Sequence, residues 1–225
     1  MPKRPLTQKE AYKAGTDHQF VDSIELGPWT SYSLLHDPKH MCFALSRYKF
    51  CAKVLEGKAN VLEVGCGDAF GIPIVAQAVQ RVVAVDPEDR LIRSNKKRLR
   101  GIKNIEFQRL DICEEVPKEI FAATFSVDVI EHLDAHLNGA FMRHQCECLH
   151  PDGICIVGTP NITAGKYATP RSRIEHINLK SHEALREQMG TYFKNVFMFS
   201  MNDEVVHTGF APMAHYLFGV GMGLK

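Results

Sequence analysis

The segment VLEVGCGDAFG, residues 61–71, joins an apolar run to a glycine-rich turn. Gly65 and Gly67 allow the chain to turn sharply and let a ligand approach the backbone closely. A dinucleotide-binding turn would place its third glycine three residues after the second, but that position holds Phe70. The turn therefore predicts a ligand-binding loop that is not the dinucleotide fingerprint.

Acidic side chains occur at this turn and where later apolar runs end. A pyrophosphate at the turn would face Glu63 and Asp68, whereas Coulomb attraction favours a cationic ligand there. Asp86 ends the run RVVAVDP, at a spacing where related folds hold a ribose diol. Asp111, in FQRLDICE, is placed to accept from an adenine amino group while the Ile112 amide faces a ring nitrogen. These residues predict an adenosyl site.

Alternating strand and helix signals must position these residues. Apolar, β-branched runs predict parallel strands at 60–64, 81–85, 105–108, 121–127 and 154–158. Helical spacing predicts helices at 71–80, 89–100 and 137–149, and a helix at 37–55 that lies over the site. Two later apolar runs joined by NDEVVHTG predict a closing antiparallel hairpin on the sheet edge. The pattern is that of an α/β fold with an open sheet.

Composition suits one compact domain, residues 1–225, with residues 1–56 as an N-terminal helical cap. The chain has 27 Lys and Arg against 26 Asp and Glu, so no overall field favours nucleic acid or an anionic membrane as partner. Apolar stretches are shorter than a membrane span, and the N-terminus lacks the apolar core of a secretory signal, so we expect a cytoplasmic protein.

Seven scattered cysteines argue against a disulfide framework. Cys146 and Cys148 form the only close pair, and a C-x-C pair without a second cluster is weak evidence for zinc. We therefore expect free thiols and no metal.

Five motifs, in this order and spacing, carry a family resemblance: VLEVGCGDAFG, VVAVDP, QRLDI, FSVDVIEHLD and LHPDGICIVGTPN. They resemble class I S-adenosylmethionine-dependent methyltransferases of the ubiquinone-biosynthesis-like group over roughly residues 40–200. The resemblance implies a Rossmann-like, mostly parallel seven-stranded sheet with helices on both faces and a C-terminal antiparallel hairpin. Ala122, where the group often has Asp, and HPDG in place of KPGG are departures from its pattern.

The same resemblance implies which residues surround S-adenosylmethionine. These are Glu63, Gly65, Cys66, Gly67, Asp86, Pro87, Asp111, Ile112, Ser126 and Val127. His132 of the IEHL segment follows the fourth strand, on the side where the methyl group is delivered. It is a candidate general base or hydroxyl-orienting group, although relatives with other substrates also carry EHL.

The segment 171–182, RSRIEHINLKSH, follows the fifth strand and concentrates Arg171, Arg173, His176 and Lys180. If the segment is extended, both arginines face the same way and suit a carboxylate or a phosphorus oxyanion. A solvated surface loop is the alternative. The Arg-x-Arg pattern, with GPWTSYSLL near the N-terminus, is similar to small bacterial methyltransferases that act on phosphonate or phosphoramidate groups.

The aromatic segment before the first strand supplies further candidates. Tyr32 is predicted to point its hydroxyl at the cofactor carboxylate or the acceptor, Trp29 to form an apolar wall, and Arg47 to pair with that carboxylate. Each is equally explained by packing of the cap.

These observations predict an O-methyltransferase for a small anionic metabolite, such as one that bears a phosphonate or phosphoramidate group. The alternative within the same chemistry is methylation of a sugar, quinol or amine, in which a hydroxyl would need His132 or His176 as base. Alternatives of other classes are a nicotinamide-dependent oxidoreductase, disfavoured by Phe70 and Asp68, and a non-catalytic adenosyl-binding module.

Overall fold

A computed structural model describes residues 4–16 and 24–225. Eight strands form the sheet: β1 (Asn60–Val64), β2 (Arg81–Asp86), β3 (Ile105–Arg109), β4 (Phe121–Val127), β5 (Leu149–Pro160), β6 (Phe193–Asn202), β7 (Val205–His207) and β8 (Tyr216–Leu224). The α-helices are α1 (Gln8–Thr16), α2 (Pro28–His36), α3 (Pro38–Val54), α4 (Ile72–Ala76), α5 (Asp89–Arg98), α6 (Asn138–Glu147), α7 (Pro170–Glu175) and α8 (His182–Gly190).

The strands form one sheet in the order β3-β2-β1-β4-β5-β8-β6-β7. The first five strands are parallel, whereas β8 pairs antiparallel with both β5 and β6. This arrangement confirms the mostly parallel α/β fold with a C-terminal antiparallel hairpin. The predicted count of seven strands is wrong, because Val205–His207 in the polar connection turns back and pairs with the end of β6.

Local sequence signals place most of the parallel strands closely. The predicted runs at 60–64 and 121–127 coincide with β1 and β4, and α3 and α5 differ from their predicted ends by one or two residues. The two arginines would face the same way only if the segment around Arg171 were extended, but it forms the helix α7, which begins with Pro170 and is capped by the Thr169 side chain.

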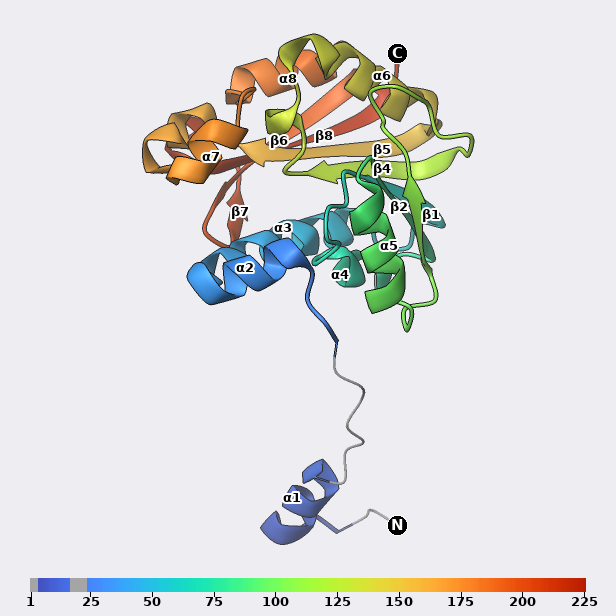
Figure 1. Ribbon diagram of the computed structural model, residues 1–225, viewed down its shortest axis with the longest axis vertical. Helices are drawn as coiled ribbons and strands as arrows, with labels where there is room; N and C mark the ends of the chain where they lie inside the picture. The colour runs from blue at the N-terminus through green and yellow to red at the C-terminus, as the bar shows by residue number, and fades with distance from the viewer. Residues whose placement is uncertain (1–3, 17–23) are drawn as a thin grey trace.

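Helices cover both faces of the sheet, with α3, α4 and α5 on one side and α6 and α8 on the other (Figure 1). Residues of each strand alternate between the two cores. In β1, Val61 packs in the cluster that contains Ile72 of α4, whereas Leu62 packs with Phe141 of α6. Glu63 therefore lies on the same face as Val61, the face covered by α3.

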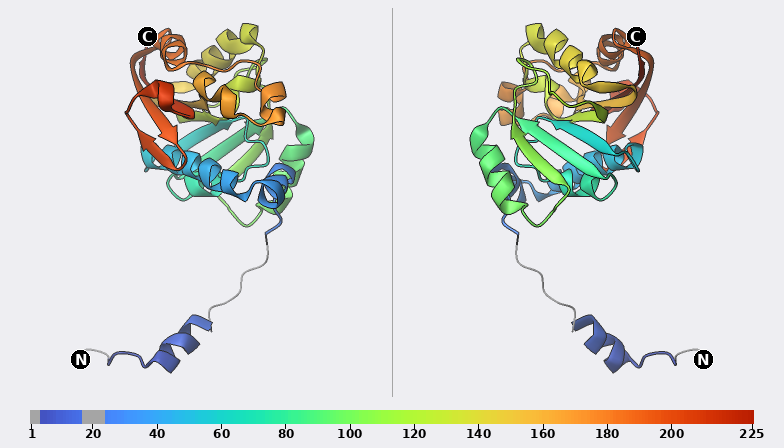
Figure 2. Two further views of the ribbon diagram at one scale, coloured as in Figure 1. Left: turned by 90° about the vertical axis from the view of Figure 1, so that its left-hand side faces the viewer. Right: turned by 90° about the vertical axis from the view of Figure 1, so that its right-hand side faces the viewer.

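The carboxyl ends of all parallel strands lie along the same side of the sheet, and ligands bind at this side in open α/β folds. The left panel of Figure 2 faces this side, with α2 and α3 in blue below it and α7 in orange above it. None of the helices in the described residues is long and apolar enough to cross a membrane. The cytoplasmic location stays a prediction.

Candidate active site

The glycine turn after β1 packs against two neighbouring side chains. Gly65 and Gly67 have φ angles of 72° and 53°, the left-handed region that glycine adopts without strain. A Cβ atom on Gly67 would lie 2.6 Å from the Trp29 ring, and one on Gly65 would lie 2.5 Å from Val129 Cγ2. Both glycines are therefore required by close approach as well as by backbone conformation.

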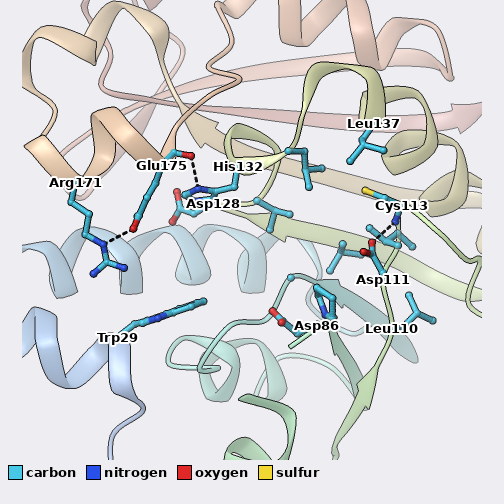
Figure 3. A pocket seen from close by; sticks show the side chains of 16 residues that line it. Trp29, Asp86, Leu110, Asp111, Cys113, Asp128, His132, Leu137, Arg171 and Glu175 are labelled. Atoms are coloured by element: carbon cyan, nitrogen blue, oxygen red, sulfur yellow. Dashed lines mark hydrogen bonds and ion pairs between the residues drawn. The ribbon is translucent and has the colours of Figure 1, made fainter. Parts of the chain in front are cut away.

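A first cavity of about 420 Å³ opens beside this turn (Figure 3). In Figure 3, Trp29 and Asp86 lie on one side of it, with His132, Glu175 and Arg171 opposite. Eight of the predicted site residues line it: Trp29, Gly65, Asp86, Pro87, Asp111, Ile112, His132 and Arg171. The wall also includes residues that the sequence analysis did not select: Val64, Leu110, Cys113, Asp128, Val129, Leu133, Leu137 and Glu175.

Asp86 and Asp111 hold the loops that follow β2 and β3. Asp86 Oδ2 accepts from the Gly67 amide at 3.0 Å, and Oδ1 accepts from the Glu88 amide at 2.9 Å. Burial raises the pKa of Asp86 above its usual value, against these two hydrogen bonds. Asp111 Oδ1 accepts from the Cys113 amide at 2.8 Å. Each carboxylate oxygen retains lone pairs for hydroxyl or amino donors of a ligand.

Glu63, predicted to bind the cofactor, is not among the residues that line this cavity. Strand alternation turns it toward α3, where the Tyr48 hydroxyl donates to Glu63 Oε1 at 2.7 Å. Its Oε2 is buried without a hydrogen-bond partner, and burial raises the pKa of Glu63 to about 8.

Four other residues that the resemblance assigns to the cofactor are buried and do not line the first cavity: Cys66, Gly67, Ser126 and Val127. All seven cysteines are free thiols, including Cys146 and Cys148.

The turn after β4 carries Asp128, which was not among the residues predicted for the site. Asp128 adopts a left-handed conformation, with φ of 59°, which Asp tolerates better than most residues. Its Oδ2 accepts from Arg47 Nη1 at 2.6 Å. Arg47 also stacks on the Tyr216 ring, 4.0 Å from the centroid. The quoted motif FSVDVIEHLD contained Asp128, and its position at the end of β4 was the available signal.

A second cavity of about 470 Å³ adjoins the first. Five residues line both: Trp29, Asp128, His132, Arg171 and Glu175. Tyr32, Arg47 and His176 line only the second cavity. The site thus consists of two connected chambers, with the predicted catalytic residues around the second.

The predicted arginine pair does not form. In α7, residues two positions apart point in widely different directions because each residue advances about 100° around the helix. Arg171 lines both cavities and forms an ion pair with Glu175 at 2.7 Å. Arg173 lines neither, and its guanidinium donates to the carbonyls of Ala168 and Lys166.

Lys180 also lies away from the cavity walls, because its ammonium donates to Asn178 Oδ1 at 2.9 Å. Asn178 in turn joins two distant segments. Its backbone amide donates to the Glu131 carbonyl at 3.0 Å, and its side-chain amide donates to the Ile130 carbonyl at 3.0 Å. These bonds hold the loop that carries His176 against the turn that carries His132.

The His132 and His176 rings meet at 74°, with centroids 5.0 Å apart. Burial and the neighbouring His132 lower the pKa of His176 below its usual value, which favours the neutral imidazole. Glu131 lies beside them, and its carboxylate offers a third group that could ligate a metal ion. Two imidazoles therefore lie on the cavity walls where the two cavities meet, with the buried carboxyl group of Glu131, which lines neither cavity, beside them.

Comparison with known proteins shows the family of the chain. A family model described as a methyltransferase domain matches residues 36–192, more than half of the chain. A probable S-adenosylmethionine-dependent methyltransferase of Mycobacterium tuberculosis is 28% identical over 103 residues, covering 45% of this chain and 36% of the relative. A ubiquinone biosynthesis O-methyltransferase of a Bradyrhizobium strain is 29% identical, covering 45% and 40%. The matched stretch thus spans well under half of these relatives.

Solved structures show the same fold. The methyltransferase domain of bacterial CtHen1-C superposes with a TM-score of 0.67 at 19% identity, covering 80% of this chain and 99% of that chain. The complex of DhpI with S-adenosylhomocysteine superposes with a TM-score of 0.63 at 16% identity, covering 86% and 90%. From the family match and the fold, the chain belongs to the methyltransferase domain family.

Proposed function

We propose that the protein transfers the methyl group of S-adenosylmethionine to a hydroxyl oxygen of a small substrate in the second cavity. Membership of the family supports the coarser activity, S-adenosylmethionine-dependent methyl transfer. The first cavity, with Asp86 and Asp111 on its wall, is the place for the cofactor. The acceptor oxygen then attacks the methyl carbon in line with the departing sulfur, and positioning supplies most of the acceleration.

The observation that carries this proposal is the position of His132. It lines both cavities, and its ring contacts His176, so both imidazoles are within reach of an acceptor bound where the cavities meet. A neutral hydroxyl is a weak nucleophile and needs a group that removes or acidifies its proton. A carboxylate or phosphonate oxygen is already ionised and would need no such group.

The charges of the second cavity favour the same choice. Arg47 and Arg171 are the only lysine or arginine residues that line it in the described chain, and both are in ion pairs, with Asp128 and Glu175. Asp37 adds a third carboxylate to the lining. An anionic substrate therefore gains little attraction here. The anionic acceptor, including a phosphonate, stays a prediction, without the paired arginines that suggested it.

The test is release of S-adenosylhomocysteine by purified protein, screened against sugars, quinols, amines, carboxylates and phosphonates at one pH. The proposal predicts turnover with neutral hydroxyl compounds, and a strongly reduced rate for the variant Asp86→Ala at subsaturating cofactor. Turnover confined to phosphonates or carboxylates would contradict the hydroxyl acceptor. Binding of the cofactor without turnover on any class would instead support a non-catalytic adenosyl-binding module.

A further inference from the structure

Glu131, His132 and His176 form a group that the methyl-donor site does not require. Each offers one ligand atom, and these atoms all lie within 4.8 Å of one another. Two ligands of one ion, each about 2.1 Å from it, lie at most about 4.2 Å apart. The most distant pair of these atoms would therefore have to approach by up to about 0.6 Å to share one ion. Three ligand-type side chains from two separate segments thus converge on one point.

The carboxylate of Glu131 provides a second, independent indication of a cation. Glu131 has 0% of its surface exposed, and Thr159 Oγ1 donates to its Oε2 at 3.0 Å. Its Oε1 is buried and has no hydrogen-bond partner. A buried carboxylate oxygen without a donor is costly, and buried charges in proteins are paired or coordinate metals. A bound cation would supply the missing partner.

Charge balance around the group also favours a cation. Asp128 faces the same cluster, and its Oδ1 is likewise buried without a hydrogen-bond partner. Asp128 and Glu131 carry two negative charges when ionised, whereas Arg47 supplies one positive charge at Asp128. A divalent ion would favour the ionised carboxylate.

The hydrogen bond of His132 prepares its ring as a ligand. Its Nδ1 lies 3.1 Å from the carbonyl oxygen of Glu175, which can only accept, so Nδ1 carries the proton. Nε2 is then left with a free lone pair. Histidine ligands in metal sites usually donate their other ring N–H to a carbonyl or carboxylate in this way. His176 supplies the second imidazole of the group.

We propose that Glu131, His132 and His176 bind one divalent transition-metal ion at the junction of the two cavities. Two imidazoles with one carboxylate suit Mn²⁺, Fe²⁺, Co²⁺ or Zn²⁺ better than Mg²⁺ or Ca²⁺, which prefer oxygen ligands. Three protein ligands leave coordination positions open for the acceptor.

The catalytic role of this ion rests on the proposed function. The ion binds the acceptor hydroxyl and lowers its pKa, and the hydroxyl proton leaves to solvent. The resulting oxygen anion forms a bond to the methyl carbon while the carbon–sulfur bond breaks. Its electron pair remains on sulfur, so the products are the methyl ether and S-adenosylhomocysteine.

The test measures metal binding separately from activity, using untagged, chelator-treated protein. Mn²⁺ is titrated and followed by electron paramagnetic resonance of the free ion, and Co²⁺ is titrated and followed by visible absorption. The wild type should bind one equivalent, and His176→Ala and Glu131→Gln should each weaken binding by at least about tenfold. His136→Ala is the matched control, because His136 lies in the same loop as His132 but outside the group.

Failure of the inference and failure of the proposed function are distinguishable. Absence of stoichiometric Mn²⁺ and Co²⁺ binding by the wild type, or equal weakening by His136→Ala, would overturn the metal site. Hydroxyl methylation that persists in chelator would also overturn its catalytic role, and leave His132 or His176 as base. Stoichiometric binding that depends on Glu131 and His176, with no methylation of any hydroxyl, would preserve the site and refute the proposed function.

Discussion

The carboxylate of Asp68 accepts from both the backbone amide and the hydroxyl of Thr30, at 2.8 and 3.0 Å. Both residues are buried, and they lie 38 positions apart in the chain. This contact fastens α2 to the glycine turn and places Trp29 over Gly67. Asp68 thus contributes more than negative charge, because it also holds in place the helix that covers the first cavity.

Asp68→Ala should detach α2 from the glycine turn. The change removes the acceptor of the buried Thr30 amide, at a cost of about 1–3 kcal/mol in the free energy of unfolding. Trp29 is the single tryptophan of the chain, so its fluorescence reports on α2 directly. We expect red-shifted emission and a smaller response to S-adenosylhomocysteine. The surface variant Asp89→Ala is the control, and an unchanged spectrum of Asp68→Ala would contradict the role of Asp68.

Asp86→Ala should weaken cofactor binding by about 1–3 kcal/mol, because charge-assisted hydrogen bonds to the cofactor hydroxyls are lost. The Gly67 and Glu88 amides also lose their acceptor. Calorimetric titration with S-adenosylhomocysteine measures the effect. Asp152 lies near the start of β5, at the opposite end of the strands from Asp86. The control variant Asp152→Ala should therefore bind S-adenosylhomocysteine like the wild type. Equal affinity of Asp86→Ala and wild type would remove Asp86 from the site.

Arg171→Ala should raise the Michaelis constant of the acceptor several-fold, since Arg171 lines both cavities and holds Glu175. Arg173→Ala is the matched control from the same helix, and its kinetics should stay near those of the wild type because Arg173 lines neither cavity. Steady-state kinetics at saturating cofactor separate the two. A similar rise in both variants would restore the paired-arginine interpretation.

Glu63→Gln should stabilise the protein increasingly as the pH rises from about 5 to 8. The pKa of Glu63 is about 8 in the fold against 4.5 for an ordinary carboxyl group. Between these values the native state keeps a proton that the unfolded chain has released, so the stability contributed below pH 4.5 is lost as pH rises through 8. Glutamine keeps an acceptor for Tyr48 and carries no charge.

Thermal unfolding of wild type and Glu63→Gln at several pH values measures this difference. The melting temperatures should be similar near pH 5 and diverge toward pH 8.5, with the variant higher. A constant difference across this range would show that Glu63 does not titrate as described.

Local patterns were sufficient for most of the parallel strands and for Asp86 and Asp111 at the ends of two of them. β1 and β4 follow from runs of apolar residues, and a residue at the end of a parallel strand must lie at the ligand-binding edge. Asp86 and Asp111 therefore reach the first cavity as the sequence predicts. Sequence spacing at a strand end translates directly into position in space.

The face on which a strand-end residue lies was decided by the tertiary structure. Glu63 ends beside the glycine turn, but packing of α3 on that face of the sheet places Tyr48 against its carboxylate. The direction of the arginines likewise depends on the backbone of 170–175, which proline and the Thr169 cap make helical. Two guanidinium groups that would be neighbours on a strand are separated on a helix.

Which side chains meet where the two cavities join depends still more on contacts between residues that are distant in the sequence. His132 and His176 were each recognised in the sequence as candidate bases, but their contact depends on Asn178, whose amides bond to the turn at Ile130 and Glu131. Thr30 and Asp68 are likewise distant in the sequence and are brought together by the packing of α2 on the glycine turn. The sequence alone determined the fold class and the side of the sheet where the cofactor is expected, because the periodicity of apolar residues and the ends of strands are local properties. Only the tertiary structure brought distant side chains together, because such contacts depend on how whole elements pack.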